Sequence, residues 1–253
     1  MLTAPIPVAQ PLRWDAVSRP GLRRVNADAT AVHHNPATGR TAFVIADGIG
    51  DNESAAHAAQ LAARTAAEAA AAGRSPVEAV LAAQRAVLGS DTGRNTSGDT
   101  GSDIGGDTVL AIAVPSGNSC EVAWVGDCRV YQWNGRVLEQ ITTDHTAAEY
   151  FRSRGLRPAP QLEHMVTTSV RTVVPDRIGH ARTSLRPGRL LLCSDGVHKP
   201  LPVGELRDLL DRPAEPAQVA GFLVAGALRF GGTDNATALV VDHQLSSETD
   251  VAA

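Results

Sequence analysis

The chain has 253 residues, of which 43% are hydrophobic and 20% are charged, and its formal net charge is −4. These proportions are typical of a globular protein with room for one large core. The acidic balance argues against nucleic acid as a partner, because binding to a phosphate backbone requires a basic face. Arginine supplies almost all of the positive charge, and we attribute the presence of a single lysine, Lys199, to coding bias.

The three cysteines, Cys120, Cys128 and Cys193, lie in or beside apolar runs. Their odd number predicts buried, reduced thiols and not a disulfide framework. The first ten residues contain Pro5 and Pro7 and no basic residue, which is not the pattern of a signal peptide. No apolar run reaches the ~20 residues that cross a bilayer. We therefore expect a cytoplasmic protein that does not contact a membrane.

Short runs rich in valine, isoleucine or aromatic residues predict strands, and alanine-rich or amphipathic stretches predict helices. In chain order the expected elements are a strand at 41–46, helices at 53–72 and 76–88, strands at 108–114, 121–125, 130–133 and 189–193, helices at 203–210 and 217–229, and a strand at 236–241. This order predicts an α+β fold with antiparallel sheets at the centre and helices packed outside.

Two local signals refine these elements. Ser75 is placed to cap the second helix, with Pro76 in its first turn. Asn134-Gly135 predicts a hairpin with a tight two-residue turn.

The polar and terminal segments set the extent of the domain. The Gly-, Ser- and Asp-rich stretch 90–106 predicts a mobile surface linker. Residues 1–12 are expected to be irregular and residues 244–253 to form a disordered tail. A single domain over residues 1–243 follows.

Four aspartates lie beside apolar runs of strand length, next to glycine or asparagine: Asp47, Asp127, Asp195 and Asp234. One aspartate at a strand end is ordinary in a turn. Four carboxylates brought together would repel one another, so such a cluster implies cations between them. Ligands that offer only oxygen suit Mg²⁺, Mn²⁺ or Ca²⁺ better than zinc or copper.

Seven short motifs occur in the order found in one protein family. They span residues 23–28, 44–50, 106–108, 125–131, 142–146, 192–197 and 231–237. In this order the sequence resembles the metal-dependent protein phosphatases, the type 2C serine/threonine phosphatases in their bacterial form. The resemblance implies a four-layer α-β-β-α sandwich, in which two central antiparallel sheets are flanked by pairs of helices.

The resemblance also implies a set of metal ligands. Asp47 would bridge two Mn²⁺ or Mg²⁺ ions, and the carbonyl of Gly48 would help to hold the second. Asp195 and Asp234 would complete the first ion. Asp127, together with Asp195, matches the position of a third, looser ion in bacterial members.

The implied activity is hydrolysis of phosphoserine and phosphothreonine by direct attack of a metal-bridging water. Arg23 would bind the phosphate and form the catalytic set with Asp47 and Asp195, while Asp28 and Asn235 would support the ligands from behind. The implied partners of this enzyme, expected to be a monomer, are phosphorylated proteins, among them a serine/threonine kinase and its substrates.

Two positions depart from the family pattern. Ala27 stands where the family carries Glu or Gln, which puts tight binding of the second ion in question. Asp51 follows Gly50 where a second glycine is usual, and we interpret it as the cap of the next helix and not as a further ligand. Residues 146–166 correspond to a variable flap at the substrate entrance, made basic by three arginines.

Several alternatives stay open. No histidine matches the general acid of the family, so His33, His34 and His145 are candidates, with a structural role favoured for His145. A degenerate member that binds phosphoproteins or a kinase without catalysis is the main alternative, and Ala27 is its support. A metal-dependent nuclease fits the aspartates but not the acidic charge. A nucleophilic cysteine is disfavoured, because Cys128 and Cys193 lie in no phosphate-binding loop that ends in arginine.

Overall fold

The computed structural model describes residues 12–90 and 105–243. The predicted surface linker, the irregular start and the disordered tail lie almost entirely outside these ranges, so they stay predictions. None of the described helices is both long and apolar enough to cross a bilayer.

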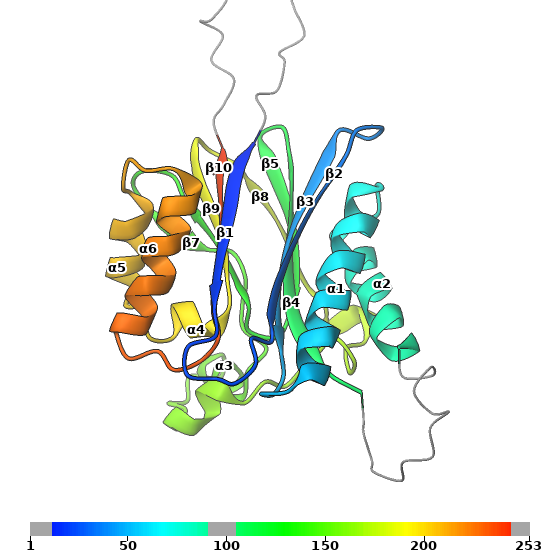
Figure 1. Ribbon diagram of the computed structural model, residues 1–253, viewed down its shortest axis with the longest axis vertical. Coiled ribbons are helices and arrows are strands. Elements are labelled where there is room, and N and C mark those ends of the chain that lie inside the picture. The colour runs from blue at the N-terminus through cyan, green and yellow to red at the C-terminus, as the bar shows by residue number, and fades with distance from the viewer. Residues whose placement is uncertain (1–11, 91–104, 244–253) are drawn as a thin grey trace, which may run out of the picture.

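Two five-stranded sheets face each other at the centre of the domain (Figure 1). One sheet has the order β1 (Arg13–Arg19), β10 (Ala236–His243), β9 (Gly188–Cys193), β6 (Arg129–Trp133) and β7 (Leu138–Gln140). The other has the order β2 (Asp28–Asn35), β3 (Arg40–Gly48), β4 (Thr108–Ser116), β5 (Ser119–Val125) and β8 (Gly179–Ser184). All neighbouring strands are antiparallel, as the sequence predicts.

Helices cover the outer face of each sheet (Figure 1). The pair α1 (Glu53–Ala71) and α2 (Pro76–Gly89) packs on the β3 side, and the pair α5 (Val203–Leu210) and α6 (Pro216–Arg229) packs on the β10 side. Shorter elements lie in the connections: α3 (Ala147–Arg152), α4 (Asp195–His198) and the 3-10 turns η1 (Pro160–His164) and η2 (Pro175–Arg177). The expected four-layer α-β-β-α sandwich is confirmed.

The strand β3 shows why the central strands are apolar without interruption. Successive side chains of a strand point to opposite faces. Phe43 and Ile45 pack between the two sheets, whereas Val44 and Ala46 pack against the alanine-rich face of α1. Both faces are therefore buried, and Asp47 is one of the last two residues of this well-packed strand.

The six predicted strands are all present, and the four that the sequence did not predict are the edge strands β1, β2, β7 and β8. An edge strand has one open side, and each of these four exposes part of its length. Their residues consequently lack the continuous apolar pattern on which the prediction depends.

Local predictions have mixed outcomes. Ser75 caps α2 in a capping box with Glu78, as predicted. The predicted hairpin joins β6 and β7, but its loop is four residues long and not two, because Trp133 pairs with Leu138. The side-chain oxygen of Asn134 accepts hydrogen bonds from two backbone amides of this loop, which closes it without a tighter turn.

Candidate active site

The strand ends at one pole of the sandwich surround a cavity of about 120 Å³. All the residues predicted to contact metal or phosphate line this cavity: Arg23, Asp47, Gly48, Asp127, Asp195 and Asp234. Asn235 lines it as well, and Asp28 lies behind it. The fold therefore brings together side chains from both sheets that are up to about two hundred residues apart in sequence.

Asp47 and Asp28 lie side by side across the β2–β3 ladder, where they pair in register. The hydroxyl of Thr108 on β4 donates a 2.7 Å hydrogen bond to the carbonyl oxygen of Asp47. Burial raises the pKa of the Asp47 carboxyl well above its usual value, and the nearby Asp28 and Asp195 raise it further. Added positive charge beside Asp47 would favour its ionised form.

Asp28 joins the two sheets behind Asp47. Its Oδ2 accepts hydrogen bonds from Ser194 Oγ at 2.7 Å and from Thr237 Oγ1 at 2.6 Å, both in the opposite sheet or at its end. Its Oδ1 is buried and has no hydrogen-bond partner among the described residues. Burial raises the pKa of Asp28 to about 7, although the two hydroxyls partly oppose this rise. This position agrees with the predicted supporting role.

Asn235 fixes the loop that carries Arg23. Its Oδ1 accepts from Ala27 N at 2.8 Å, and its Nδ2 donates to the carbonyl oxygens of Pro20 and Val25 at 3.0 Å each. Gly21 has a φ of +60°, and a side chain there would place its Cβ 2.3 Å from a backbone oxygen of Asp234. Only glycine permits this close approach.

The close approach of Gly21 to the backbone of Asp234 also brings Arg23 beside the Asp234 side chain. Arg23 Nη2 donates to Asp234 Oδ2 at 2.7 Å, and both side chains are about 40% exposed (43% and 39%). The hydrogen bond to Asp234 raises the pKa of Arg23. The predicted phosphate-binding fork therefore lies at the cavity with a carboxylate as its partner.

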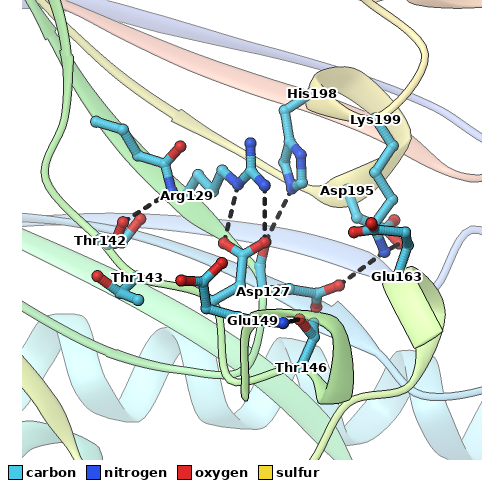
Figure 2. A network of polar contacts seen from close by, with 12 residues as sticks. Asp127, Arg129, Thr142, Thr143, Thr146, Glu149, Glu163, Asp195, His198 and Lys199 are labelled. Carbon is cyan, nitrogen blue, oxygen red and sulfur yellow. Dashed lines mark hydrogen bonds and ion pairs between the residues drawn. The ribbon is translucent and has the colours of Figure 1, made fainter. Parts of the chain in front are cut away.

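On the other side of Asp47, Lys199 lies between two of the predicted ligands (Figure 2). Its Nζ donates to Asp127 Oδ2 at 2.8 Å and to Asp195 Oδ2 at 2.7 Å. Burial alone would raise the pKa of Asp195, but Lys199 outweighs it and leaves that pKa below its usual value. The single lysine, whose rarity we attributed to coding bias, therefore contacts two of the predicted ligands.

Two histidines hold the backbone beside Asp127. His198 Nε2 donates to the carbonyl oxygen of Asp127 at 2.9 Å, and burial lowers the pKa of His198 to about 4, so the ring is neutral. His145 Nδ1 accepts from Gly126 N at 3.3 Å, and His145 N donates to Gly126 O at 2.9 Å. His145 lies in the structural position that the sequence analysis favoured.

Comparison with known proteins decides the family. Residues 23–227 match the family model described as protein phosphatase 2C. This chain belongs to the protein phosphatase 2C family. It is 28% identical over 147 residues to the serine/threonine phosphatase Stp of Listeria monocytogenes, which covers 56% of this chain and 58% of that protein. It is 29% identical over 236 residues to the serine/threonine protein phosphatase PstP of Mycobacterium tuberculosis, which covers 91% of this chain and 45% of that protein.

The chain thus spans about half the length of these curated relatives. A crystal structure of the catalytic domain of PstP in complex with two manganese ions superposes with a TM-score of 0.74 at 28% identity. That match covers 91% of this chain and 97% of the crystallised one. The protein phosphatase 2C sandwich is therefore shared over nearly all of the described fold.

The donor set fits the hard cations of a protein phosphatase 2C site. Among the described residues, no three acidic, histidine or cysteine side chains are arranged so that they could already hold a metal ion. Arg23 and Lys199 instead supply the positive charge among the aspartates. The four aspartates of the cavity nevertheless offer oxygen donors, burial disfavours the anionic form of Asp47, and Asp28 Oδ1 has no partner among the described residues. A divalent cation would stabilise these carboxylates.

The general-acid candidates do not reach the cavity. His33 and His34 pair with Ala42 and Thr41, at the end of the β2–β3 ladder opposite Asp28. The structure instead places His164 in the cavity lining, with Nδ1 3.5 Å from Lys199 Nζ. His164 ends η1 in the flap, and no motif in the sequence marks it.

The flap and its arginines are ordered by local contacts. A bridge between Thr146 and Val166 closes the base of the flap. Arg152 forms ion pairs with Glu149 and Glu163, and the Arg154 guanidinium lies 3.5 Å from the centre of the Tyr150 ring. Two of its three arginines therefore already have partners within the flap.

Ala27 and Asp51 differ from the family in ways that the structure explains. Ala27 is 1% exposed and packs with Ala55 and Ala56 at the start of α1. Asp51 is not the cap of α1, contrary to prediction. Asn52 caps the helix, and Asp51 Oδ1 instead accepts from Val25 N at 2.9 Å.

The cysteines are reduced and buried, as predicted. Burial raises the pKa of Cys128 and of Cys193, which disfavours the thiolate that a nucleophile requires.

Proposed function

We propose that the protein is a Mg²⁺- or Mn²⁺-dependent phosphatase that hydrolyses phosphoserine and phosphothreonine in proteins. One observation carries the proposal: four aspartates and Arg23 line a single cavity in a chain of the protein phosphatase 2C family. Fold alone would not support an activity. The retained acidic and basic side chains do support it.

The carboxylates would hold two ions. Asp47 lines the cavity and would help to hold both, with the Gly48 carbonyl on one and with Asp195 and Asp234 on the other. When bound, such ions supply an acidified water for direct attack on phosphorus and neutralise charge on the phosphoryl oxygens. Asp28, held by two hydroxyls, keeps Asp47 in place from behind.

Arg23 would bind the phosphate. Its guanidinium presents a planar fork that matches two phosphoryl oxygens. Its present partner, Asp234, is half-exposed, so exchanging a carboxylate for a phosphate requires little desolvation. Asn235 holds the loop so that this exchange occurs at the cavity mouth.

The substrates would be phosphorylated proteins, among them a serine/threonine kinase and its targets. The relatives Stp and PstP are named as serine/threonine phosphatases, which supports this class of substrate. Arg23 and the aspartates of the cavity would receive the phosphate group of such a substrate.

The test is hydrolysis of p-nitrophenyl phosphate and of a phosphothreonine peptide with Mn²⁺, with Mg²⁺ and with chelator. We expect turnover that needs the metal, that chelator abolishes and that Asp195→Ala loses. Asp208→Ala is the matched control, because Asp208 is an exposed carboxylate on α5 paired only with its neighbour Arg207.

A non-catalytic binding module is the alternative, and the buried Ala27 in place of a polar residue is the observation that favours it. Folded protein without turnover at any Mn²⁺ concentration would refute the phosphatase. Retained binding of the phosphopeptide by that protein would then establish the module.

A further inference from the structure

Lys199 is the only lysine in the chain, and its side chain contacts two of the carboxylates that line the cavity. The side chain is 18% exposed, and the carboxylates that it joins are 4% exposed at Asp127 and 17% exposed at Asp195. Its Nζ contacts one oxygen of each at 2.8 and 2.7 Å (Figure 2). An ammonium group therefore lies where the resemblance implies a third divalent ion.

The local fold builds this contact. The helix α4 begins at Asp195, and Lys199 N donates to Asp195 O at 3.0 Å, so the two side chains lie one turn apart on the same face. The preceding residue, His198, donates to the carbonyl oxygen of Asp127. Two consecutive residues thus hold Asp127 by its carboxylate and by its backbone.

An ion at this position would compete with the ammonium for the same oxygens. Mg²⁺ binds carboxylate oxygen at about 2.0–2.1 Å and demands near-octahedral geometry. Lys199 is covalently tethered, so it does not dissociate at low metal concentration as a weakly held ion does. To displace the ammonium, the ion would have to shed bound water, which Mg²⁺ does reluctantly, and Lys199 would have to leave both carboxylates.

We propose that Lys199 replaces the third divalent ion, so that this phosphatase works with two ions and a built-in ammonium group. The proposal rests on the proposed function for its first two ions. Lys199 is a positioning residue: it acts through Asp195, whose carboxylate it orients, and through Asp127. Activity then saturates once the two ions are bound, with no further rise at higher metal concentration.

Counting bound ions tests this directly. Metal-free wild type, Lys199→Met, Lys199→Arg and the surface control Arg207→Met are titrated with Mn²⁺ by calorimetry, with free Mn²⁺ measured by electron paramagnetic resonance. We expect two ions in wild type, Lys199→Arg and Arg207→Met, and three in Lys199→Met, the third bound more weakly. The turnover of Lys199→Met should gain a second rise at higher Mn²⁺ concentration.

Three ions in wild type would overturn the proposal. The proposal would also be overturned if Lys199→Met bound only two ions and its turnover had the same dependence on metal concentration as wild type.

A second measurement needs no variant. Protein labelled with ¹³C at the lysine ε-carbon gives one ε-methylene NMR signal, because Lys199 is the only lysine. During a Mg²⁺ titration we expect this signal to stop moving once two ions are bound. A later shift to the position of a solvated lysine would show that a third ion displaces the ammonium, and would refute the proposal even if Lys199→Met did not fold.

These readouts separate the two proposals, because neither needs turnover. Two ions and a fixed lysine signal without phosphatase activity would refute the proposed activity and support the replacement. Metal-dependent turnover with three ions in wild type would support the proposed activity and refute the replacement of the third ion by Lys199.

Discussion

Two groups of ion pairs flank Asp47, and they differ in their exposure to water. On one side Arg23 and Asp234 are 43% and 39% exposed. On the other, Lys199 is 18% exposed and its partner Asp127 is 4% exposed. Exposed ion pairs contribute about 0–1 kcal/mol to stability, whereas breaking a buried pair by removing one partner costs about 3–5 kcal/mol.

The difference assigns a separate task to each basic side chain. Under the proposed function, Arg23 would leave its exposed carboxylate at little cost and bind an incoming phosphate. Lys199 stays with its carboxylates and keeps them oriented. We therefore expect the Arg23–Asp234 pair to be exchangeable and the contacts of Lys199 with Asp127 and Asp195 to be permanent. The following changes test this difference.

The largest effect should come from Asp47→Asn, which removes the carboxylate between the two sides. We expect turnover to fall roughly a thousandfold, about 4 kcal/mol of transition-state stabilisation, because metal-assisted catalysis is worth several kcal/mol. Steady-state kinetics at saturating Mn²⁺ measure this loss. Asp208→Asn should stay near wild type, and Asp47→Asn within tenfold of wild type would contradict the central role of Asp47.

Removing the largely buried contacts of Lys199 should lower the stability of the protein. In chelator at pH 8, Lys199→Met should lower the free energy of unfolding by about 3 kcal/mol, because Asp127 and Asp195 lose their shared cation. Urea denaturation measures the change, with the exposed Arg207→Met expected to stay within about 0.5 kcal/mol of wild type. Equal effects of the two variants would show that the Lys199 contacts are as weak as surface ion pairs.

The buried carboxyl group of Asp28 should make the stability of the metal-free protein depend on pH. The pKa of Asp28 is raised to about 7 in the folded protein, from a usual 3.8, so the folded state holds its proton over that interval. This contribution is fully present below pH 4 and is lost as pH rises through 7. We expect the metal-free protein to lose roughly 2 kcal/mol between pH 5 and pH 8 relative to Asp28→Asn.

Urea denaturation of both proteins across this pH interval measures the difference. Parallel curves for wild type and Asp28→Asn would show that Asp28 titrates normally.

Removing the exposed Arg23–Asp234 ion pair should have the smallest effect. Arg23→Ala should lower kcat/KM about tenfold by removing a charge-assisted contact to phosphate. The same change should alter the unfolding free energy by less than about 1 kcal/mol, since the pair with Asp234 is exposed. Arg24→Ala is the matched control, because Arg24 is the adjacent arginine and is 85% exposed. If Arg23→Ala lowered the free energy of unfolding more than Lys199→Met does, the expected difference between the two ion-pair groups would be wrong.

The fold was predictable from the sequence where burial is two-sided. Strands such as β3 and β10 are apolar on both faces and were predicted nearly in full. The edge strands β1 and β8 alternate or mix polar and apolar residues, because many of their side chains are exposed. Their pairing depends on partners far along the chain, which a local pattern does not contain.

The site was predictable for a related reason. Asp47 and Asp195 were singled out because they lie at or near the ends of apolar runs that form central strands. Lys199 and His164 were missed because their approach depends on the short helix α4 and on the path of the flap. One signal for Lys199 was present: it lies four residues after Asp195, the spacing of one helical turn.

The pairing of β1 with β10 has a consequence for engineering. Arg13 lies opposite Asp242, so the two ends of the described chain leave the sandwich side by side (Figure 1). From Asp234, beside the cavity, β10 runs about 25 Å to this far pole. A short peptide that joins the two ends would permit circular permutation, with new termini opened in a surface loop. A reporter domain fused at either end would likewise stand away from the cavity mouth.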